Sequence, residues 1–398
     1  MYESPAKPIE EAGKKVSLDV AYNFVQLNYP IWVFYFKKLT LPNFGGRHEI
    51  KISGKPAIYD VFVSGDKNYV VAIGRYDRVA DWSRLICVFD SGCEVIGQVV
   101  EDFADEKEAY QVSIIKYLIP SGFRSKPVVL ITLKLDGSQI VNSLQLSNHS
   151  VELPRHKLSV TTLMKDEDRF IPEWIAYYRM IGVSHFYIYD NRSLKRRRIR
   201  NLLAPLIAQG IVTLIDWDYP YVSGAPDNSW RFCQRGQMHH CLYKYGSFSD
   251  WMLFIDVDEF IYPVNAEQDF LKFLESREHP NIAALQFKMI WFGNSGFEQV
   301  PKGLIINNYI RRSPEVLSLG REKCAVRPQL TKLMFIHGVK ACEENSWMDV
   351  VSPELFRINH YYATSSKRQF KGYSDHNDVE DTGMRKYVDS VEEYIGKI

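Results

Sequence analysis

The pattern of apolar and polar residues divides the chain into two parts. Between about residues 47 and 150, short apolar runs alternate with turn residues such as Ser-Gly, Asp-Gly, Gly and Pro. The runs are AIYDVFVSG, NYVVAIGRYD, SRLICVFDSG, EVIGQVVEDF, AYQVSIIKYLI, KPVVLITLKLDG and QIVNSLQLS. Because β-branched and aromatic residues dominate them, they are typical of strands. They predict a β-sandwich domain over residues 46–152, after a lead-in segment over residues 1–45. The pattern leaves open whether this domain binds glycan or is purely structural.

From residue 153 onward the pattern changes to strands that alternate with helices. Residues 158–165 (LSVTTLMK) predict a buried strand, and residues 166–182 predict a helix with its apolar residues on one face. The elements expected next are a strand at 183–191, a helix around 195–209, a strand at 211–217 and a helix at about 229–246. This alternation predicts a parallel, three-layer α/β domain over residues 153–398.

The stretch WMLFIDVDEF, residues 251–260, is the most informative in the chain. Its apolar start predicts a central strand that is buried on both faces, and the carboxylates of Asp256, Asp258 and Glu259 follow at once. If the strand continues through them, Asp256 and Asp258 share one face and repel each other. A divalent cation, Mn²⁺ or Mg²⁺, would remove the repulsion and leave coordination sites for a pyrophosphate. A solvated turn or a helix N-cap is the alternative.

Charge and composition narrow the kinds of binding partner that the chain is expected to have. Lys and Arg total 49 against 48 Asp and Glu, a net charge of +1, so no global charge favours nucleic acid or an acidic membrane surface. The basic run at residues 195–200 is therefore interpreted as a solvated surface. The apolar stretch at residues 29–39 is too short to span a bilayer, and no signal peptide is evident. We expect a cytoplasmic protein, or a Golgi-lumen protein if an anchor has been removed. A homodimer is left open.

Several ordered motifs closely resemble the family 92 glycosyltransferases. The motifs are MKDEDRFIPEWIAYYRMIGVSHFYIYDNRS, WMLFIDVDEFIYP, MIWFGNSGF (289–297), REKCAVRP (321–328), His337 and INHYYATSSKRQF (358–370). The resemblance is strong over residues 155–375 and faint over residues 47–150. It implies a GT-A fold, a nucleotide-sugar donor such as UDP-galactose, Mn²⁺, a glycan acceptor and inversion at the anomeric carbon.

The resemblance also implies residue roles at the ends of the strands. The residues expected to hold the nucleotide sugar are Lys165, Asp166 and Glu167 after the first strand, Asp190 and Asn191 after the second, and Asp256. For Asp190 and Asn191 an ordinary turn is the alternative. Asp256 and Asp258 would bind the metal, with Glu259 orienting them. His337 is the first choice for a further metal ligand and His360 the second, although a structural histidine is the alternative for each.

Inversion requires a general base near the acceptor hydroxyl. Glu298, Glu343, Glu344 and Asp349 are candidates, and the sequence does not choose among them. Trp291 and Phe292 are interpreted either as an aromatic platform for the acceptor or as core. Two other functions fit parts of the pattern. One is a catalytically inactive glycan-binding relative, and the other is a metal-dependent phosphohydrolase or nucleotidyltransferase.

Overall fold

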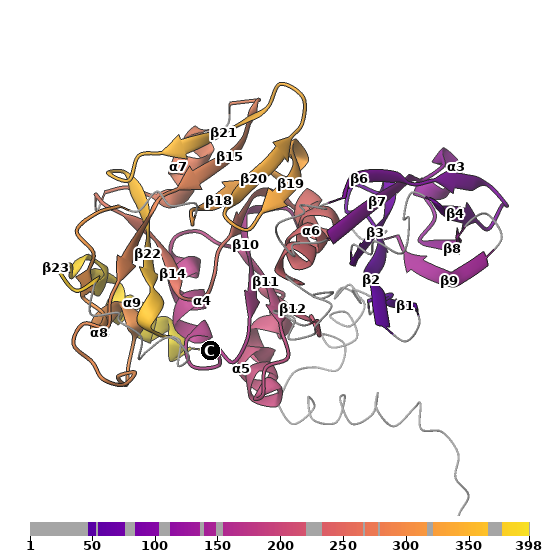
Figure 1. The fold of residues 1–398 in the computed structure, drawn as a ribbon. Helices are drawn as coiled ribbons and strands as arrows, with labels where there is room; N and C mark the ends of the chain where they lie inside the picture. The colour runs from indigo at the N-terminus through magenta and orange to yellow at the C-terminus, as the bar shows by residue number, and fades with distance from the viewer. Residues whose placement is uncertain are drawn as a thin grey trace, which may run out of the picture. The chain divides into compact units, whose positions relative to one another are not determined.

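The fold is taken from a computed structural model of the chain (Figure 1). The residues that it describes are 47–52, 55–75, 84–102, 112–135, 139–148, 154–219, 233–265, 267–277, 279–316, 321–364 and 376–397. The predicted lead-in segment, residues 1–45, lies outside these ranges. Residues 45–398 form one compact unit.

The first part of the chain folds into two antiparallel sheets. The strands of one sheet are β1 (Ile50–Ile52), β2 (Lys55–Val63), β3 (Tyr69–Arg75), β7 (Val112–Leu118) and β6 (Gln98–Asp102), in that order. Those of the other are β5 (Glu94–Ile96), β4 (Leu85–Phe89), β8 (Val128–Leu135) and β9 (Gln139–Ser147), with the short helix α3 (Ser121–Arg124) between β7 and β8. Residues of both sheets share one apolar core. Each of the seven predicted runs contains a strand, whereas their arrangement as a sandwich stays a prediction.

One predicted run, EVIGQVVEDF, contributes to both sheets. It divides at Gly97, so that β5 belongs to one sheet and β6 to the other. A side chain at Gly97 would place its Cβ 2.4 Å from Ile115 Cγ2, far inside the normal contact distance. The close passage of the chain at this corner therefore requires glycine.

A seven-stranded sheet organises the second part of the chain. Its strands in spatial order are β12 (Val212–Asp216), β11 (His185–Asp190), β10 (His156–Met164), β13 (Ser249–Phe254), β18 (Lys323–Val326), β15 (Ile282–Phe287) and β21 (Trp347–Val351). β18 is antiparallel to both of its neighbours, and the remaining pairs are parallel. β11 and β12 lie on one side of β10, whereas β13 lies on the other. The direction in which strands are added therefore reverses between β10 and β13, and open α/β sheets bind ligands at such a point.

Three helices correspond to the predicted ones, namely α4 (Ile171–Met180), α5 (Arg196–Ala208) and α6 (Cys233–Tyr245). Three shorter helices were not predicted, namely α7 (Phe270–Ser276), α8 (Ile305–Asn308) and α9 (Val388–Ile395). The helix predicted from residue 166 begins later, because Asp166 has a positive φ of 60° and Pro172 occupies the first turn. The predicted alternation of strands and helices is confirmed, and its three-layer arrangement stays a prediction. No helix in the described ranges is long and apolar enough to cross a membrane.

The apolar strand predicted to end in the carboxylates is β13, and a second strand follows the acidic turn. β13 ends at Phe254, and β14 (Glu259–Pro263) joins a second sheet. The other strands of this sheet are β22 (Phe356–Tyr361), β16 (Met289–Phe292), β17 (Arg311–Arg312) and β23 (Val379–Glu380), in that order after β14. A hairpin of β19 (Thr331–Phe335) and β20 (Gly338–Cys342) completes the strands. Asp256 and Asp258 therefore lie in the turn between two sheets, and the same-face argument for a strand does not apply to them.

Helix α6 is buried along most of its length because strands contact it on more than one side. It contacts β10 and β19, and also β2 and β3. Asp60 of β2 accepts hydrogen bonds from His240 Nε2 at 2.8 Å and from Lys244 Nζ at 2.9 Å, and all three residues are buried. The Lys244 ammonium of α6 is thus balanced by a carboxylate far away in the sequence. The domain boundary at residue 152 stays a prediction.

Candidate active site

The turn between β13 and β14 carries the three carboxylates and is fixed by its backbone. Trp174 Nε1 of α4 donates to the carbonyl oxygen of Asp256 at 3.0 Å. The N–H of Tyr361 donates to the carbonyl oxygen of Asp258 at 2.8 Å, and that of Glu259 donates to the Asp256 carbonyl at 3.2 Å. These contacts satisfy backbone groups that a turn would otherwise leave unpaired, and they hold the carboxylates in place.

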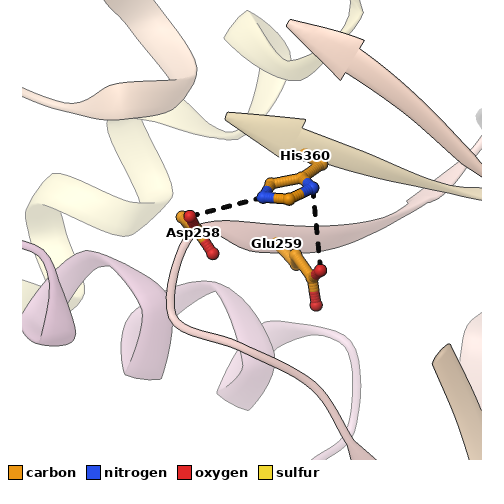
Figure 2. A group of neighbouring side chains, drawn as sticks. All are labelled: Asp258, Glu259 and His360. Atoms are coloured by element: carbon orange, nitrogen blue, oxygen red, sulfur yellow. Dashed lines mark hydrogen bonds and ion pairs between the residues drawn. The ribbon is translucent and has the colours of Figure 1, made fainter. Parts of the chain in front are cut away.

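Asp258, Glu259 and His360 form a compact group of potential metal ligands (Figure 2). Glu259 of β14 and His360 of β22 are direct partners across the two strands. His360 Nε2 lies 3.3 Å from Asp258 Oδ2, and its Nδ1 lies 3.7 Å from Glu259 Oε1. One ligand atom from each residue lies within 4.8 Å of the others. Two carboxylates and an imidazole suit Mn²⁺, so the residues fit the expected cation.

Asp256 has a different partner, the buried Lys323. Lys323 Nζ donates to Asp256 Oδ2 at 2.7 Å and lies 3.7 Å from Glu259 Oε2. The side chain of Lys323 is 4% exposed, whereas that of Asp256 is 36% exposed. Burial lowers the pKa of Lys323, but the two carboxylates outweigh it and raise that pKa above its usual value. Lys323 was missed from the sequence, although a lysine at the start of the apolar strand KCAV was a usable signal.

Glu259 is the most deeply buried of the three carboxylates. Its side chain is 2% exposed, and its Oε2 accepts the N–H of Asp256 at 3.0 Å. Burial raises the pKa of Glu259 to about 7, against the opposing effect of the Lys323 ammonium. A carboxyl group in this position is thus costly to ionise unless a cation lies beside it.

His337 lies outside the ligand group, in the turn between β19 and β20. Gln286 Nε2 donates to its carbonyl oxygen at 3.2 Å. Burial, helped by the Lys323 ammonium, lowers the pKa of His337 to about 4. Its Nδ1 is buried without a hydrogen-bond partner in the described structure. Of the two predicted histidines, the second choice, His360, is the one that the structure brings to Asp258.

Comparison with known proteins places the chain in one family. The model of the family described as "Glycosyltransferase family 92" matches residues 157–394. The chain belongs to glycosyltransferase family 92. A family 92 protein of Ricinus communis is 25% identical over 329 residues, which cover 76% of this chain and 56% of that protein. One from Oryza sativa is 30% identical over 213 residues, 52% of this chain and 33% of that protein. A galactan β-1,4-galactosyltransferase of Arabidopsis thaliana is 26% identical over 206 residues, 50% of this chain and 39% of that protein.

The matches cover only part of the length of each relative. The matched region of the Ricinus relative is about half of its length, and those of the other two relatives are shorter fractions. The family model begins within β10 and ends in α9, so it spans the seven-stranded sheet and the ligand group. The activity of the whole protein is therefore a matter for proposal.

The family 92 residues expected after the first strand lie at the end of β10. Lys165 and Asp166 are exposed, and Glu167 is partly buried. The Asp166 carboxylate accepts the N–H of Leu194 at 2.6 Å, and the Asp166 N–H donates to Ser193 Oγ at 2.8 Å. This loop thus joins the ends of β10 and β11, and Lys165 keeps an exposed side chain at the carboxyl edge of the sheet.

Asp190 and Asn191 make structural contacts at the end of β11. Asp190 has no exposed surface, and its Oδ2 accepts from Arg196 Nε at 2.8 Å. Asn191 Nδ2 donates to the carbonyl oxygens of Trp217 and Tyr219, at 2.8 and 2.6 Å. Both side chains therefore connect β11 to α5 and to the segment after β12, and a nucleotide contact at this position stays a prediction.

None of the four candidate bases belongs to the ligand group. Glu298 is exposed in the loop after β16, and Glu343 and Glu344 are exposed after β20. Glu343 forms an ion pair with Lys332 at 2.9 Å. Asp349 is partly buried on the edge strand β21, where its Oδ1 accepts from the next backbone N–H. The positions of these four carboxylates do not identify which of them acts as the general base.

The two aromatic residues of β16 have separate roles. Phe292 is 1% exposed and packs on Tyr361 with ring centroids 4.7 Å apart, so it belongs to the core. Trp291 is partly buried and stacks on Tyr362 at 5.0 Å. Its ring centroid lies 6.2 Å from that of His360, which places Trp291 beside the ligand group.

The basic run at residues 195–200 is largely neutralised by nearby carboxylates. The ion pairs are Arg196 with Asp190 and Asp218, Lys195 and Arg198 with Asp168, and Arg200 with Asp216. These pairs favour the interpretation of the run as an ordinary surface, because the charges are already balanced locally.

Proposed function

We propose that this family 92 chain is a metal-dependent glycosyltransferase with a GT-A fold. It transfers a hexose, galactose from UDP-galactose, to a glycan acceptor with inversion at the anomeric carbon. The observation that carries the proposal is the Asp258–Glu259–His360 group at the end of β13, next to the reversal of strand order. The choice of galactose follows the name of the Arabidopsis relative, a galactan β-1,4-galactosyltransferase.

Position and chemistry both support a nucleotide-sugar donor at the carboxyl edge of the seven-stranded sheet. Ligands of open α/β sheets lie at the carboxyl ends of the strands where strand order reverses. A nucleotide sugar brings a diphosphate, and a divalent cation held there would neutralise the leaving group. Asp258, Glu259 and His360 would hold that cation, and the backbone contacts of the turn keep two of them in place.

A recess beside Asp256 of about 10 Å³, roughly the size of one water molecule, exposes polar groups that would contact the donor. Its lining includes Thr161 and Thr162 of β10, Gln234 and Gln237 of α6, and Lys323. Thr162 Oγ1 is buried and has no hydrogen-bond partner in the described part of the chain. Since such groups cost free energy unless something pairs with them, this hydroxyl supports a polar ligand in the pocket.

The acceptor and the base complete the proposal. Trp291, next to His360, would pack against the acceptor sugar, because aromatic faces suit the apolar face of a hexose. The base for inversion is proposed among Glu298, Glu343, Glu344 and Asp349. Replacement of each by its amide separates them: only the base variant loses kcat for transfer while it keeps its affinity for the donor.

The test is a thermal-shift screen of UDP, GDP, CMP and dTDP, each with Mn²⁺ or with EDTA. We expect one nucleotide, UDP, to raise the Tm only when the metal is present. UDP release that rises with added acceptor then distinguishes transfer from hydrolysis by a phosphohydrolase. No shift with any nucleotide would contradict the proposal and favour an inactive glycan-binding relative.

A further inference from the structure

Trp291, which lies beside the ligand group, has ring and cation neighbours of its own. Tyr362 stacks on its indole ring at 5.0 Å with an interplanar angle of 11°, and the ring of His376 meets it edge-on at 4.8 Å. The Arg321 guanidinium lies over the same indole, 5.3 Å from the ring centroid. We propose that Arg321 and His376 make this surface an acceptor subsite for a sugar that carries an anionic group, an inference that rests on the proposed function.

The charge of Arg321 is not balanced by a neighbouring carboxylate. Its side chain is exposed and forms no ion pair or hydrogen bond with the residues that the structure describes. The arginines of β17, the strand paired with β16, differ in this respect, because Arg311 pairs with Glu380 and Arg312 with Asp381. A guanidinium over an indole is weakly hydrated, and its planar fork can bind a carboxylate or a sulfate through two parallel hydrogen bonds.

The acidic turn does not supply the missing counter-ion. Lys323 Nζ donates to Asp256 Oδ2 at 2.7 Å, so one of the three carboxylates of the turn already has a cation. A divalent cation held by Asp258 and Glu259 would balance the other two. Because the turn and its cations would then be neutral together, the charge of Arg321 is left for the substrate.

His376 is fixed beside Trp291 by the residue that follows it. Asn377 Oδ1 accepts the N–H of Ser295 at 2.9 Å, and Asn377 Nδ2 donates to Asn294 Oδ1 at 2.6 Å. These bonds tie His376 to the loop after β16. The His376 side chain is partly buried, and its ring makes no hydrogen bond within the described ranges. Since an imidazole ring offers at least one N–H donor, His376 adds a second donor at the edge of the indole.

The position of Tyr362 limits how a sugar can reach Trp291. Its parallel ring covers one face of the indole, so a sugar must approach past Arg321 and His376. A neutral hexose would use mainly the aromatic surface. A uronate carboxylate or a sulfate ester would also pair with the guanidinium, and such charge-assisted hydrogen bonds are roughly twice as strong as neutral ones. The acceptor class is therefore an anionic glycan.

The decisive experiment measures the binding of three matched disaccharides to the full chain by isothermal titration calorimetry, with and without UDP and Mn²⁺. One is galactobiose, and the other two carry a hexuronate or a sulfated galactose in place of its second galactose. We compare the native chain with R321M, R321K, H376F and R311M. Arg311 is the matched control, because its exposed side chain already pairs with Glu380 at 3.2 Å. We expect the native chain to bind at least one anionic disaccharide at least about tenfold more tightly than galactobiose.

The readout is the ratio of the two affinities, anionic over neutral, which a purely structural role would not change. R321M abolishes the preference, because it removes the charge and keeps an apolar side chain over the indole. R321K keeps part of it, since lysine retains the charge but not the fork. H376F lowers the ratio by about two- to threefold, because phenylalanine keeps the ring contact and removes the N–H donor. R311M keeps the native ratio.

Two results would overturn the inference, and they differ from failure of the proposed function. A native chain that binds no anionic disaccharide more tightly than galactobiose would contradict an anionic acceptor. A preference that survives in R321M would remove Arg321 from the subsite, and weaker UDP binding in that variant would then assign the guanidinium to the diphosphate. By comparison, absence of sugar transfer by a native chain that still prefers the anionic disaccharide would contradict the proposed function alone.

Discussion

Replacement of Asp60 by Asn tests how strongly the first part of the chain stabilises helix α6. Asp60 is fully buried and accepts hydrogen bonds from His240, Lys244 and the backbone N–H of His48, at 2.8, 2.9 and 2.6 Å. The Asn side chain has nearly the same volume, so D60N removes the charge and leaves the Lys244 ammonium buried without its counter-ion. Breaking a buried ion pair in this way costs about 3–5 kcal/mol of unfolding free energy.

The assay is urea denaturation at neutral pH, followed by tryptophan fluorescence. D60N lowers the unfolding free energy by about 3–5 kcal/mol, and the double variant D60N/K244M recovers at least part of that loss, because it removes the unpaired ammonium as well. The matched control is K134M, which breaks the exposed pair of Lys134 with Glu94 at 3.4 Å. Such exposed pairs contribute about 0–1 kcal/mol.

The effect of D60N also has a defined pH dependence. Burial by itself raises the pKa of Asp60, but Lys244 and His240 outweigh it and hold that pKa below its usual value. A carboxyl with a lowered folded-state pKa contributes its stability in full above the unfolded pKa of about 4, and this contribution is lost as the pH falls further. The difference between native chain and D60N therefore shrinks below about pH 4. A cost under about 1 kcal/mol at pH 7 would refute the reasoning.

Two further predictions concern the buried histidines and Trp291. Burial lowers the pKa of His185 to about 3 and those of His239 and His240 to about 4. Between about pH 6.5 and 4 these histidines take up protons only when the chain unfolds, so the free energy of unfolding falls as the pH drops through that range. Urea denaturation measures it, and constant stability over that range would contradict the prediction. Trp291→Ala raises the KM for the acceptor without changing Mn²⁺ affinity. Trp347→Ala, on the exposed edge strand, is the control and changes neither the KM nor the Mn²⁺ affinity. Equal effects of the two substitutions would contradict the assignment of Trp291 as the acceptor platform.

Much of the second part of the fold could be predicted because its strands are long apolar runs. The predicted strands at 158–165, 183–191 and 211–217 each differ from the observed ones by three residues or fewer at either end. The same-face argument for Asp256 and Asp258 failed because Val257, inside the turn, continues the apolar pattern although the strand has ended. Residue type alone does not show that the chain leaves one sheet there and enters another.

The carboxylates of the candidate site could be predicted from their own sequence pattern, whereas His360 was named only through the family resemblance. The D-V-D-E stretch could be found because carboxylates after a buried strand are unusual. Lys323 and His360 join it from β18 and β22, and strand pairing brings them there, which a single sequence does not encode visibly. Asp190 illustrates the converse, because a carboxylate at the end of a strand has the same local sequence whether it faces a ligand or pairs with an arginine.

The most direct test of the central claim is transfer of galactose from UDP-galactose to a galactose-terminated oligosaccharide, measured with Mn²⁺ and with EDTA. The measurement compares the native chain with D258N, whose melting curve without metal serves as the control for folding. We predict product only with Mn²⁺, and a loss of at least about a hundredfold in D258N, because the metal-stabilised leaving group supplies several kcal/mol to the transition state. Equal transfer in EDTA, or full activity in D258N, would contradict the account.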